Sequence, residues 1–418
     1  MPKIRDLKLT FTGNSTMKSN KIRQIIDFLM EHYEIRINRF KPSQKEIVSK
    51  TKKYTFPPSL DDISLHLQEN EIAVSDSILR KIINSPNQIQ TYDPISEYFF
   101  SIADTYLGIS QIDLFCSLIK TVNYGDRIGE NYYQNRFVQV FRKWMVASVA
   151  CSLREHQNEV ALGLIQEEEG TGKTTICNWL CPEPLKMMFT RSDREKNGFN
   201  LRQSFTENFI VLFDEFIGLN HFTAETFKST MSAVEIDVKD RHDPFPVRKP
   251  RIANAMFTTN NKTGRNKGFL FSGLGTRRFA CIHIESIEYD RLMAEVDVNQ
   301  MWAEAYTLFK GGFNYKWQPK DFTEFAEVNE RFMIETNAVQ ILEANFTRPM
   351  NGHDGLWMTP TELMVLFKEK RLAGRDSLAE LSPEKIGIAL RQLGYEKKGK
   401  RMDGVIKYPY NVHPLFPV

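Results

Sequence analysis

The sequence has few cysteines, and they form no pattern. The 5 cysteines among 418 residues are Cys116, Cys151, Cys177, Cys181 and Cys281. Cys177 and Cys181 fall within one expected helix, and no second pair lies at metal-ligand spacing, which argues against a zinc site and against a disulfide framework. We therefore expect reduced thiols and a cytoplasmic protein.

Long hydrophobic runs are also missing. No apolar segment approaches the roughly 18 residues that a membrane-spanning helix needs, and the start MPKIRDLKLT has charges but no apolar signal core. We expect no membrane partner. The hydrophobic content of 41% is enough for a substantial core, and 418 residues suggest two or three domains. The net charge of +3 is too small to identify a nucleic-acid-binding protein by itself.

The first part of the chain is rich in helical patterns. Apolar residues at helical spacing predict a helix over 20–32, EIRINRF at 34–40 alternates like a strand, and DDISLHLQEN at 61–70 predicts another helix. We expect an α-rich N-terminal accessory domain over residues 1–110. Lysines gather between residues 41 and 53, where they form either phosphate contacts or a solvated face.

The middle of the chain alternates short apolar strands with helices. A helical pattern over 134–154 leads to a strand at 160–165, and further strands are expected at 209–213, around 255–257 and at 281–284. This order is typical of a mostly parallel α/β sheet. We expect the core at residues 111–315 and a helical connector at 316–350.

The pattern at the end of the chain predicts two helices followed by a hairpin. Ser382 is a plausible N-cap of the second helix, Pro383 occupies its first position and Gly394 its end. A winged-helix-like C-terminal domain over 351–418 fits this order. A helical cap that covers the core is the alternative.

The sharpest local motif is GTGKTT, which follows the strand at 160–165 and precedes a helix. Glycines let backbone N–H groups approach a phosphate chain, Lys173 would bridge the β and γ phosphates of ATP, and Thr174 would hold Mg²⁺. The residues expected to bind the nucleotide are Gly170, Thr171, Gly172, Lys173, Thr174 and Thr175. Glu167 stands where the usual pattern has its first glycine, so an inward-pointing carboxylate there would weaken binding.

Two further strands end in polar residues that suit ATP hydrolysis. FIVLF ends in Asp214, a second expected Mg²⁺ ligand, and Glu215, which could act as general base on the attacking water. Asn260 follows the strand AMFTT and could orient that water. Arg277 and Arg278 enter the strand at 281–284, where a ring ATPase would offer a guanidinium to its neighbour. All six residues Lys173, Asp214, Glu215, Asn260, Arg277 and Arg278 are candidate catalytic groups.

The order of these motifs resembles superfamily three helicases, and more closely the virulence-associated protein E family of phage and mobile-element replication proteins. The resemblance covers most of the chain and is carried by GTGKTT, VLFDEF, a basic hairpin region, FTTNN and FLFSGLGTRRF, with RINRFKPS before them and VNERF after them. It implies an AAA+-like ATPase core, ATP with Mg²⁺, a homo-hexameric ring and DNA in a central pore. By motif order Arg278 looks like the arginine finger.

The resemblance also implies a DNA-binding hairpin between the acidic pair and Asn260. In EIDVKDRHDPFPVRKPRIA the expected tip carries Lys239, Arg241 and His242, and the returning strand carries Arg248, Lys249 and Arg251. The other interpretation is a basic surface loop. Family members are often joined to a primase domain, but nothing before residue 110 looks like a primase centre, so a primase would be a separate chain.

Two functional hypotheses follow from the sequence. The first is an ATP-dependent DNA helicase or translocase that acts in replication of a phage or mobile element. The second is a DNA-binding initiator or scaffold whose nucleotide site is a switch rather than a motor, motivated by Glu167 and the expected winged helix. A small-molecule kinase is disfavoured by the acidic pair, Asn260 and the two arginines together.

Overall fold

The structure is a computed structural model, and the chain divides into two compact units. The N-terminal unit comprises Met1–Ser101 with Pro184–Met187, and the core unit comprises Ile102–Glu183 with Met188–Val418. The structure describes residues 14–125, 131–192, 200–216, 221–239, 245–260, 268–270, 276–333, 337–349, 355–374, 378–379, 381–393, 395–402 and 405–416.

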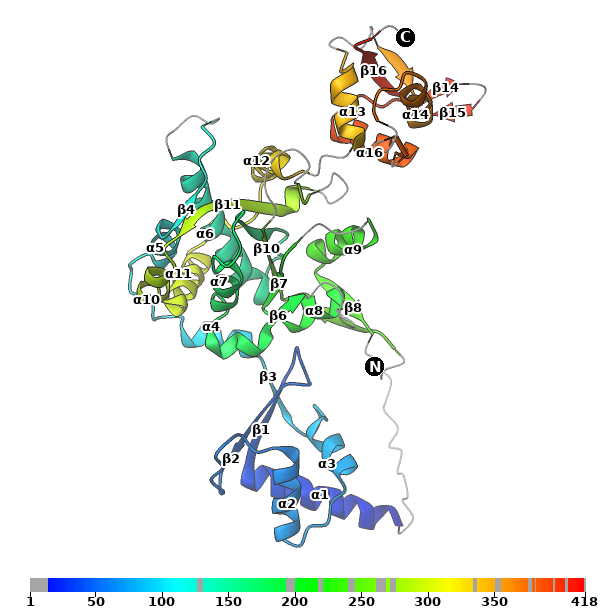
Figure 1. Ribbon diagram of the computed structural model, residues 1–418. Helices are drawn as coiled ribbons and strands as arrows, with labels where there is room; N and C mark the ends of the chain where they lie inside the picture. Colours follow the sequence, from blue (N-terminus) through cyan, green and yellow to red (C-terminus); the bar gives the residue numbers. More distant parts are fainter. Residues whose placement is uncertain are drawn as a thin grey trace, which may run out of the picture. The chain divides into compact units, whose positions relative to one another are not determined.

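The N-terminal unit combines helices with a small sheet (Figure 1). Its helices are α1 (Asn14–His32), α2 (Leu60–Glu69), α3 (Asp76–Ile83) and α4 (Pro94–Ser101), and its strands are β1 (Tyr33–Asn38), β2 (Lys45–Ser49) and β3 (Gln90–Tyr92). The strand order is β2-β1-β3, with β2 antiparallel and β3 parallel to β1. The helices at 20–32 and 61–70 and the strand at 34–40 are confirmed. The expectation of an α-rich fold missed β2 and β3, because neither short strand carries a clear alternation of apolar residues.

A six-stranded sheet forms the centre of the core unit (Figure 1). In spatial order its strands are β4 (Ile119–Thr121), β11 (Phe279–Ile287), β5 (Ala161–Ile165), β10 (Asn254–Thr259), β7 (Ile210–Phe213) and β6 (Phe189–Ser192). Five of them run parallel and β4 is antiparallel to β11. The predicted mostly parallel α/β sheet is therefore confirmed, and its carboxyl edge brings the ends of β5, β10 and β7 together.

Burial explains why some strands were visible in the sequence. Every residue of β5, β7 and β10 is buried, so these central strands are continuous apolar runs, as parallel strands covered on both faces usually are. The edge strands β4 and β6 are only partly buried. Their mixed composition gave no strand pattern, and both were missed.

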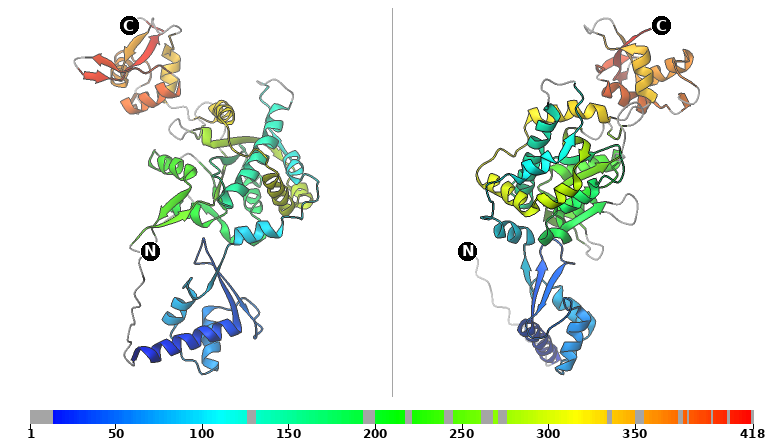
Figure 2. Two further views of the ribbon diagram at one scale, coloured as in Figure 1. Left: turned by 180° about the vertical axis from the view of Figure 1, so that it is seen from behind. Right: turned by 60° about the vertical axis from the view of Figure 1, so that its left-hand side comes forward.

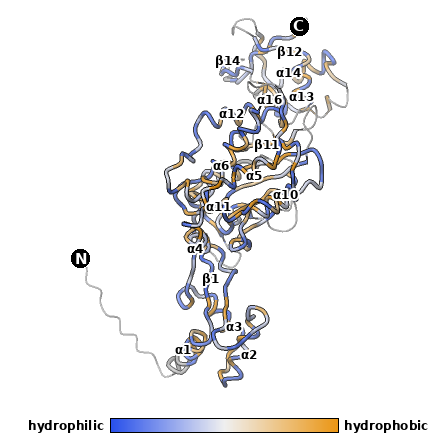
Figure 3. Tube along the Cα trace, turned by 90° about the vertical axis from the view of Figure 1, so that its left-hand side faces the viewer, coloured by the Kyte–Doolittle hydropathy of each residue, from blue (hydrophilic) through white to orange (hydrophobic). Residues whose placement is uncertain are grey.

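Helices and one hairpin complete the core unit (Figure 2). They are α5 (Gln111–Ser117), α6 (Tyr132–Ser152), α7 (Lys173–Trp179), α8 (Leu201–Glu207), α9 (His221–Ser232), β8 (Glu235–Val238), β9 (Val247–Pro250), η3 (Thr276–Arg278), α10 (Tyr289–Glu295), α11 (Val298–Lys310), α12 (Pro319–Asn329) and η4 (Glu330–Phe332). The short helix η1 (Glu183–Met188) includes Pro184–Met187, which belong to the N-terminal unit. Helix α6 confirms the pattern predicted at 134–154. Orange, hydrophobic stretches mark α5 and α11 in Figure 3.

Buried polar contacts fix α6 to the amino end of β10. Ser152 Oγ donates to Ile252 O at 2.9 Å, and Asn254 Nδ2 donates to Ser152 Oγ at 3.0 Å. Asn158, in the loop after α6, donates from Nδ2 to Ser148 Oγ at 3.0 Å. Because these buried groups satisfy one another, the start of β10 is held in one position and register.

Phenylalanines from β10, β11, α9 and the segment after β7 pack together in the core unit. Phe257 of β10 lies 5.3 Å from Phe216 and 5.5 Å from Phe279 between ring centroids, and Phe227 stacks on Phe279 at 5.5 Å. All four are buried. Edge-on and stacked aromatic pairs of this kind add to the burial energy and leave little room for rearrangement.

The C-terminal segment has a hydrophobic cluster of its own. Its helices are α13 (Asn337–Asn345), α14 (Pro360–Glu369) and α16 (Pro383–Gln392), and its strands are β12 (Phe346–Thr347), β13 (Leu356–Met358), β14 (Lys400–Met402), β15 (Val405–Lys407) and β16 (Tyr410–Pro414). The order helix, helix, hairpin agrees with the sequence, and β16 additionally pairs with β12 and β13. Thr359 and Glu362 form a capping box at α14.

All five cysteines are buried thiols. Within the described residues, no group of three or more His, Cys, Asp or Glu side chains could hold a metal ion. No helix in the described part of the chain is long and apolar enough to cross a membrane.

Gly163 offers a test of the packing in the centre of the sheet. An added Cβ would lie 1.9 Å from Phe257 Cζ, so we expect Gly163→Ala to destabilise the core by about 1–3 kcal/mol through overpacking. The midpoint of urea unfolding, followed by fluorescence of the buried Trp144 and Trp302, measures this. Gly374→Ala is the control, because an added Cβ there meets nothing within 4 Å. Equal midpoints for the two variants would contradict the predicted packing.

Candidate functional site

A glycine loop, residues 166–172, connects β5 to α7. Gly170 and Gly172 have φ angles of 72° and 87°, in the left-handed region that favours glycine, and Gly172 is the N-cap of α7. Glu167, Glu168 and Glu169 are exposed. The three carboxylates that border the loop therefore face solvent, where their repulsion of an anionic ligand is weakened.

Lys173, the first residue of α7, folds back onto this loop. Its Nζ donates to Glu168 O at 2.8 Å and to Thr171 Oγ1 at 2.9 Å, and the side chain is buried. Burial lowers the pKa of the Lys173 ammonium, while the nearby carboxylate of Asp214 acts in the opposite direction. The cation is thus held beside the loop by the loop's own oxygen atoms.

The carboxylate of Asp214 joins three elements at the carboxyl edge of the sheet. Asp214 follows β7 and is largely buried. Its Oδ1 accepts from Thr174 Oγ1 of α7 at 2.7 Å and from the Thr258 hydroxyl of β10, and its Oδ2 lies 2.6 Å from a guanidinium nitrogen of Arg191 on β6. A buried carboxylate needs such partners, and this set ties the start of α7 to the sheet.

Glu215 and Asn260 lie at the same edge. Glu215 is exposed and has a φ angle of 49°, which is unusual for a residue other than glycine, and its N–H donates to Thr258 Oγ1 at 3.4 Å. Asn260 directly follows β10, between the ends of β5 and β7. Strained backbone at such a position motivates a functional hypothesis for Glu215.

The structure brings most of the predicted nucleotide residues together. The loop with Gly170, Thr171 and Gly172, the start of α7 with Lys173, Thr174 and Thr175, and the strand ends with Asp214, Glu215 and Asn260 all lie at the carboxyl edge of the sheet. Thr175 is exposed beside the loop. Their combined oxygen atoms and N–H groups can hold a phosphate chain and a hard cation.

Arg277 and Arg278 lie elsewhere. They form η3 at the amino end of β11, and β11 runs parallel to β5, with Phe279 opposite Ala161. The two arginines are therefore at the opposite edge of the sheet from the glycine loop. Arg278 donates to Ser232 Oγ at 2.9 Å, and its pKa is lowered by burial and by the neighbouring Arg277.

Two residues of the site were not recognised in the sequence. Thr258 donates to Asp214, although in the sequence it only marked the end of a strand. Arg191 pairs with Asp214, but it was not among the residues expected at the site. A basic residue near the end of an edge strand is the pattern that could have identified Arg191. That pattern was not visible because β6 had not been predicted.

The predicted hairpin exists as β8 and β9, which pair in an antiparallel register from Glu235 opposite Pro250 to Val238 opposite Val247. Lys239 is exposed just after β8, while Arg241 and His242 lie outside the described residues. Arg248 is paired across the strands with Asp237 at 3.0 Å.

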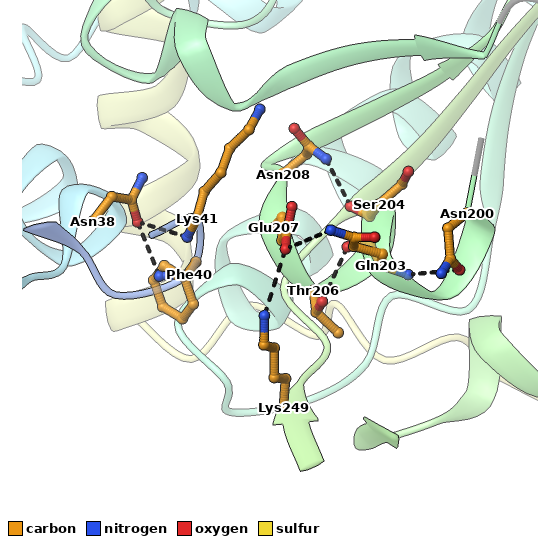
Figure 4. A network of polar contacts seen from close by, with 10 residues as sticks. All are labelled: Asn38, Phe40, Lys41, Asn200, Gln203, Ser204, Thr206, Glu207, Asn208 and Lys249. Atoms are coloured by element: carbon orange, nitrogen blue, oxygen red, sulfur yellow. Dashed lines mark hydrogen bonds and ion pairs between the residues drawn. The ribbon is translucent and has the colours of Figure 1, made fainter. Parts of the chain in front are cut away.

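Lys249 of β9 has a partner within the core unit. Its Nζ lies 3.5 Å from Glu207 Oε1, which also accepts from Gln203 Nε2 at 3.0 Å (Figure 4). The expectation that Arg251 grips phosphates on the same strand is wrong. Arg251 is only 2% exposed and donates to Asn158 O at 2.8 Å, so it anchors the base of the hairpin to the core.

Comparison with known proteins places these residues in a family. Residues 127–334 match the virulence-associated protein E-like domain. The chain therefore contains a virulence-associated protein E-like domain. The virulence-associated protein E-like domain includes the glycine loop, Asp214, Asn260, the β8–β9 hairpin and Arg278. Residues 1–126 and the C-terminal segment lie outside it.

Solved structures with similar chains have low sequence identity. The apo structure of the NrS-1 C-terminal region is 12% identical, with 94% of this chain and 98% of that chain covered and a TM-score of 0.42. The X-ray structure of JCV helicase is 11% identical, with 68% of this chain and 81% of that chain covered and a TM-score of 0.31. No curated protein sequence matches the chain.

The donor set of the virulence-associated protein E-like domain fits a hard divalent cation. Thr174 and Asp214 supply a hydroxyl and a carboxylate whose oxygens are 2.7 Å apart, and Mg²⁺ prefers oxygen ligands of this kind. Arg191 now supplies the positive charge beside Asp214 Oδ2. A cation at this carboxylate would compete with that guanidinium.

If Arg191 and a divalent cation compete for the Asp214 carboxylate, removing Arg191 should change how this protein responds to Mg²⁺. Arg191→Met leaves the buried Asp214 with hydroxyl donors only, so we expect a stability loss of about 1–2 kcal/mol without metal, since the arginine is half-exposed. Added Mg²⁺ should then raise the unfolding temperature more than in the wild type. Arg291→Met, which removes an exposed ion-paired arginine from α10, is the control. An unchanged Mg²⁺ response in Arg191→Met would contradict the competition.

Proposed function

We propose that this protein is an ATP-dependent DNA helicase or translocase that acts as a ring in the replication of a phage or mobile genetic element. The observation that carries the proposal is the contact between Thr174 and Asp214, 2.7 Å, which joins the glycine loop and the acidic strand end into one site. A loop that can cradle phosphates and a carboxylate that can hold a metal are the minimal parts of an ATPase.

Each residue of the site would have one role in ATP hydrolysis. The backbone of Gly170–Thr175 would bind the phosphates, Lys173 would leave Glu168 O and Thr171 for the β and γ phosphates, and Thr174 and Asp214 would hold Mg²⁺. The metal would neutralise charge on the phosphates. Glu215 would polarise the attacking water and Asn260 would orient it.

A homo-hexameric ring is supported by the position of the two arginines. Because Arg277 and Arg278 lie at the amino end of β11, they face away from the glycine loop of their own chain. A guanidinium in that place would act on ATP bound to a neighbouring copy, as arginine fingers do. The match to the virulence-associated protein E-like domain and the mostly parallel sheet support an AAA+-like core.

DNA is the proposed partner of two basic regions. On the β8–β9 hairpin, Lys239, Arg241, His242 and Lys249 would contact phosphates of single-stranded or forked DNA. In the C-terminal segment, Lys400 Nζ lies 3.8 Å from the Trp357 ring centroid, and Tyr408 is 61% exposed. A cation and an exposed aromatic ring beside a hairpin suit a winged-helix-like domain that binds DNA, with residues 351–418 as its extent. Primer synthesis would require a separate primase.

The proposed domain order remains that of the sequence. Residues 1–110 would be an accessory domain, 111–315 the ATPase core and 316–350 a helical connector. The cluster of α13, α14 and α16 with β16 supports a separately packed C-terminal domain.

Variants of the hydrolytic residues test the motor. We expect Lys173→Ala to lose ATP binding, and Glu215→Gln to bind ATP while steady-state hydrolysis falls by about 10²–10⁴-fold, because only the general base is removed. Phosphate release and unwinding of a labelled fork measure both activities, and Lys310→Ala, which removes an exposed lysine of α11 far from the loop in sequence, is the control. The helicase proposal would be contradicted if single-stranded DNA did not stimulate ATP hydrolysis and the protein did not unwind the fork.

An initiator that uses ATP as a switch is the second candidate. It is favoured by the way Lys173 and Asp214 are satisfied by Thr171, Glu168 O and Arg191, since such a site can rest between ligands without turnover. In that case the wild type would show no sustained ATP hydrolysis. Lys173→Ala would nevertheless abolish assembly and DNA binding, because both would depend on bound ATP. A wild-type protein that hydrolyses ATP continuously excludes this candidate.

The hairpin provides a separate test of DNA binding. We expect a Lys239→Ala and Arg241→Ala double variant to keep basal ATP hydrolysis but lose unwinding. The slope of log affinity for single-stranded DNA against log salt concentration should become shallower by about 0.7 for each phosphate that the variant no longer neutralises. Fluorescence anisotropy at several salt concentrations measures this slope. Lys310→Ala removes an exposed lysine of α11 and should change nothing. If both proteins show the same slope, the hairpin does not bind DNA.

A further inference from the structure

An open pocket of about 530 Å³ lies beside the glycine loop. One wall is the loop itself, with Gln166, Glu168 and Gly172. The other wall is the end of β11 and the start of α10, with Glu285, Ser286 and Tyr289. The two walls meet because β11 runs parallel to β5, with His283 opposite Ile165, so both strands end at the same edge of the sheet.

The size and charge of the pocket limit what it can hold. A volume of this order suits a small organic group, since ligand pockets span about 300–1,000 Å³. Glu168 and Glu285 place two carboxylates on its walls, which disfavours a second anion. The occupant should be uncharged and should carry hydroxyl or amino donors.

Tyr289 gives the pocket an aromatic side that touches the glycine loop. A Cβ added to Gly172 would lie 2.8 Å from Cδ2 and from Cε2 of the Tyr289 ring. The absence of a side chain at Gly172 therefore admits this ring, in addition to allowing the φ angle of 87°. Tyr289 is half-buried, so part of its ring remains open to a ligand in the pocket. Planar aromatic bases bind such rings by stacking.

The side-chain oxygen of Gln166 is a hydrogen-bond acceptor without a donor among the described residues. The backbone N–H of Gln166 donates to Thr259 O at 3.2 Å. Its side-chain Nε2 donates to Glu285 O at 3.3 Å, which fixes the orientation of the side-chain amide. The Oε1 atom is buried and has no hydrogen-bond partner among the described residues. Burial without a partner is unfavourable, so a hydroxyl or amino group of a ligand in the pocket would find an acceptor here after a small shift of the side chain.

We propose that this pocket binds the nucleoside half of the nucleotide, with the base stacked on Tyr289 and the ribose hydroxyls directed to the carboxylates of Glu168 and Glu285. The inference rests on the proposed function, because it assigns the phosphates to the adjacent glycine loop. It adds a second set of contacts that recognises a nucleoside rather than a phosphate chain. Tyr289 is then the residue that makes a nucleotide bind more tightly than its phosphates alone.

Binding of three ligands distinguishes the contributions of the base, the ribose and the phosphates to affinity. Isothermal titration calorimetry of the full chain with Mg²⁺ would compare ATP, ribose 5′-triphosphate and inorganic tripolyphosphate. In the wild type we expect ATP to bind about tenfold to a hundredfold more tightly than ribose 5′-triphosphate, the ratio that loss of one stacked base produces. This comparison needs no variant, so it holds even if a substitution prevents folding.

Variants of Tyr289 then assign the contact. Tyr289→Ala should lose the preference for ATP over ribose 5′-triphosphate while its affinity for tripolyphosphate stays at the wild-type value. Tyr289→Phe keeps the ring and should keep the preference.

The inference is overturned if the wild type binds ATP and ribose 5′-triphosphate equally. It is also overturned if Tyr289→Ala keeps the preference, or loses tripolyphosphate and ATP affinity in equal measure, since the ring would then only shape the loop. A wild-type chain that binds none of the three ligands refutes the proposed function itself. That outcome differs from every result that refutes the pocket alone.

Discussion

The carboxylate of Asp214 is the constraint on which the site depends. A buried charge is tolerated only where partners surround it, and here those partners come from three different elements. Thr174 in the first turn of α7 fixes the rotation of that helix against the sheet, Thr258 links β10, and Arg191 links the edge strand β6. The N–H groups of the glycine loop are therefore aimed by a contact made outside the loop. The order of the parallel strands β10, β7 and β6 brings these partners to the same part of the sheet.

The groups that would meet a nucleotide already satisfy one another. Lys173 is held by Glu168 O and Thr171, and Asp214 by two hydroxyls and a guanidinium. A ligand must exchange these contacts rather than add to them, so the free energy of binding is a difference between two hydrogen-bonded states. Such exchange suits both a motor and a switch, because in each case the contacts return when the ligand leaves. What distinguishes the two functions is the rate of turnover and its coupling to DNA.

How much the sequence revealed depended on burial. The strands at 160–165 and 209–213 were predicted correctly because central parallel strands are unbroken apolar runs. The edge strand β6, in which three of four residues are polar, formed no such run, and Arg191 was missed with it. The contribution of Arg251 was misjudged for a different reason. Linear charge patterns do not show which arginine of a basic stretch turns inward, and Arg251 pairs with a carbonyl 93 residues away. Tyr289 could not be found at all, since its contact with the loop depends on how β11 and β5 align.

Strand polarity also bears on assembly. In a parallel sheet all carboxyl ends lie at one edge, and β5 separates its two ends by 5 residues, or about 16 Å. Arg278 precedes Phe279, which lies opposite the first residue of β5, whereas the glycine loop follows the last. No rotation of the Arg278 side chain spans that separation, and its contact with Ser232 holds it at the amino edge. A guanidinium from this position can reach a nucleotide only on another copy of the chain. If Arg278 takes part in hydrolysis, a single chain is an incomplete enzyme, and dependence of the hydrolysis rate on protein concentration follows from the direction of one strand.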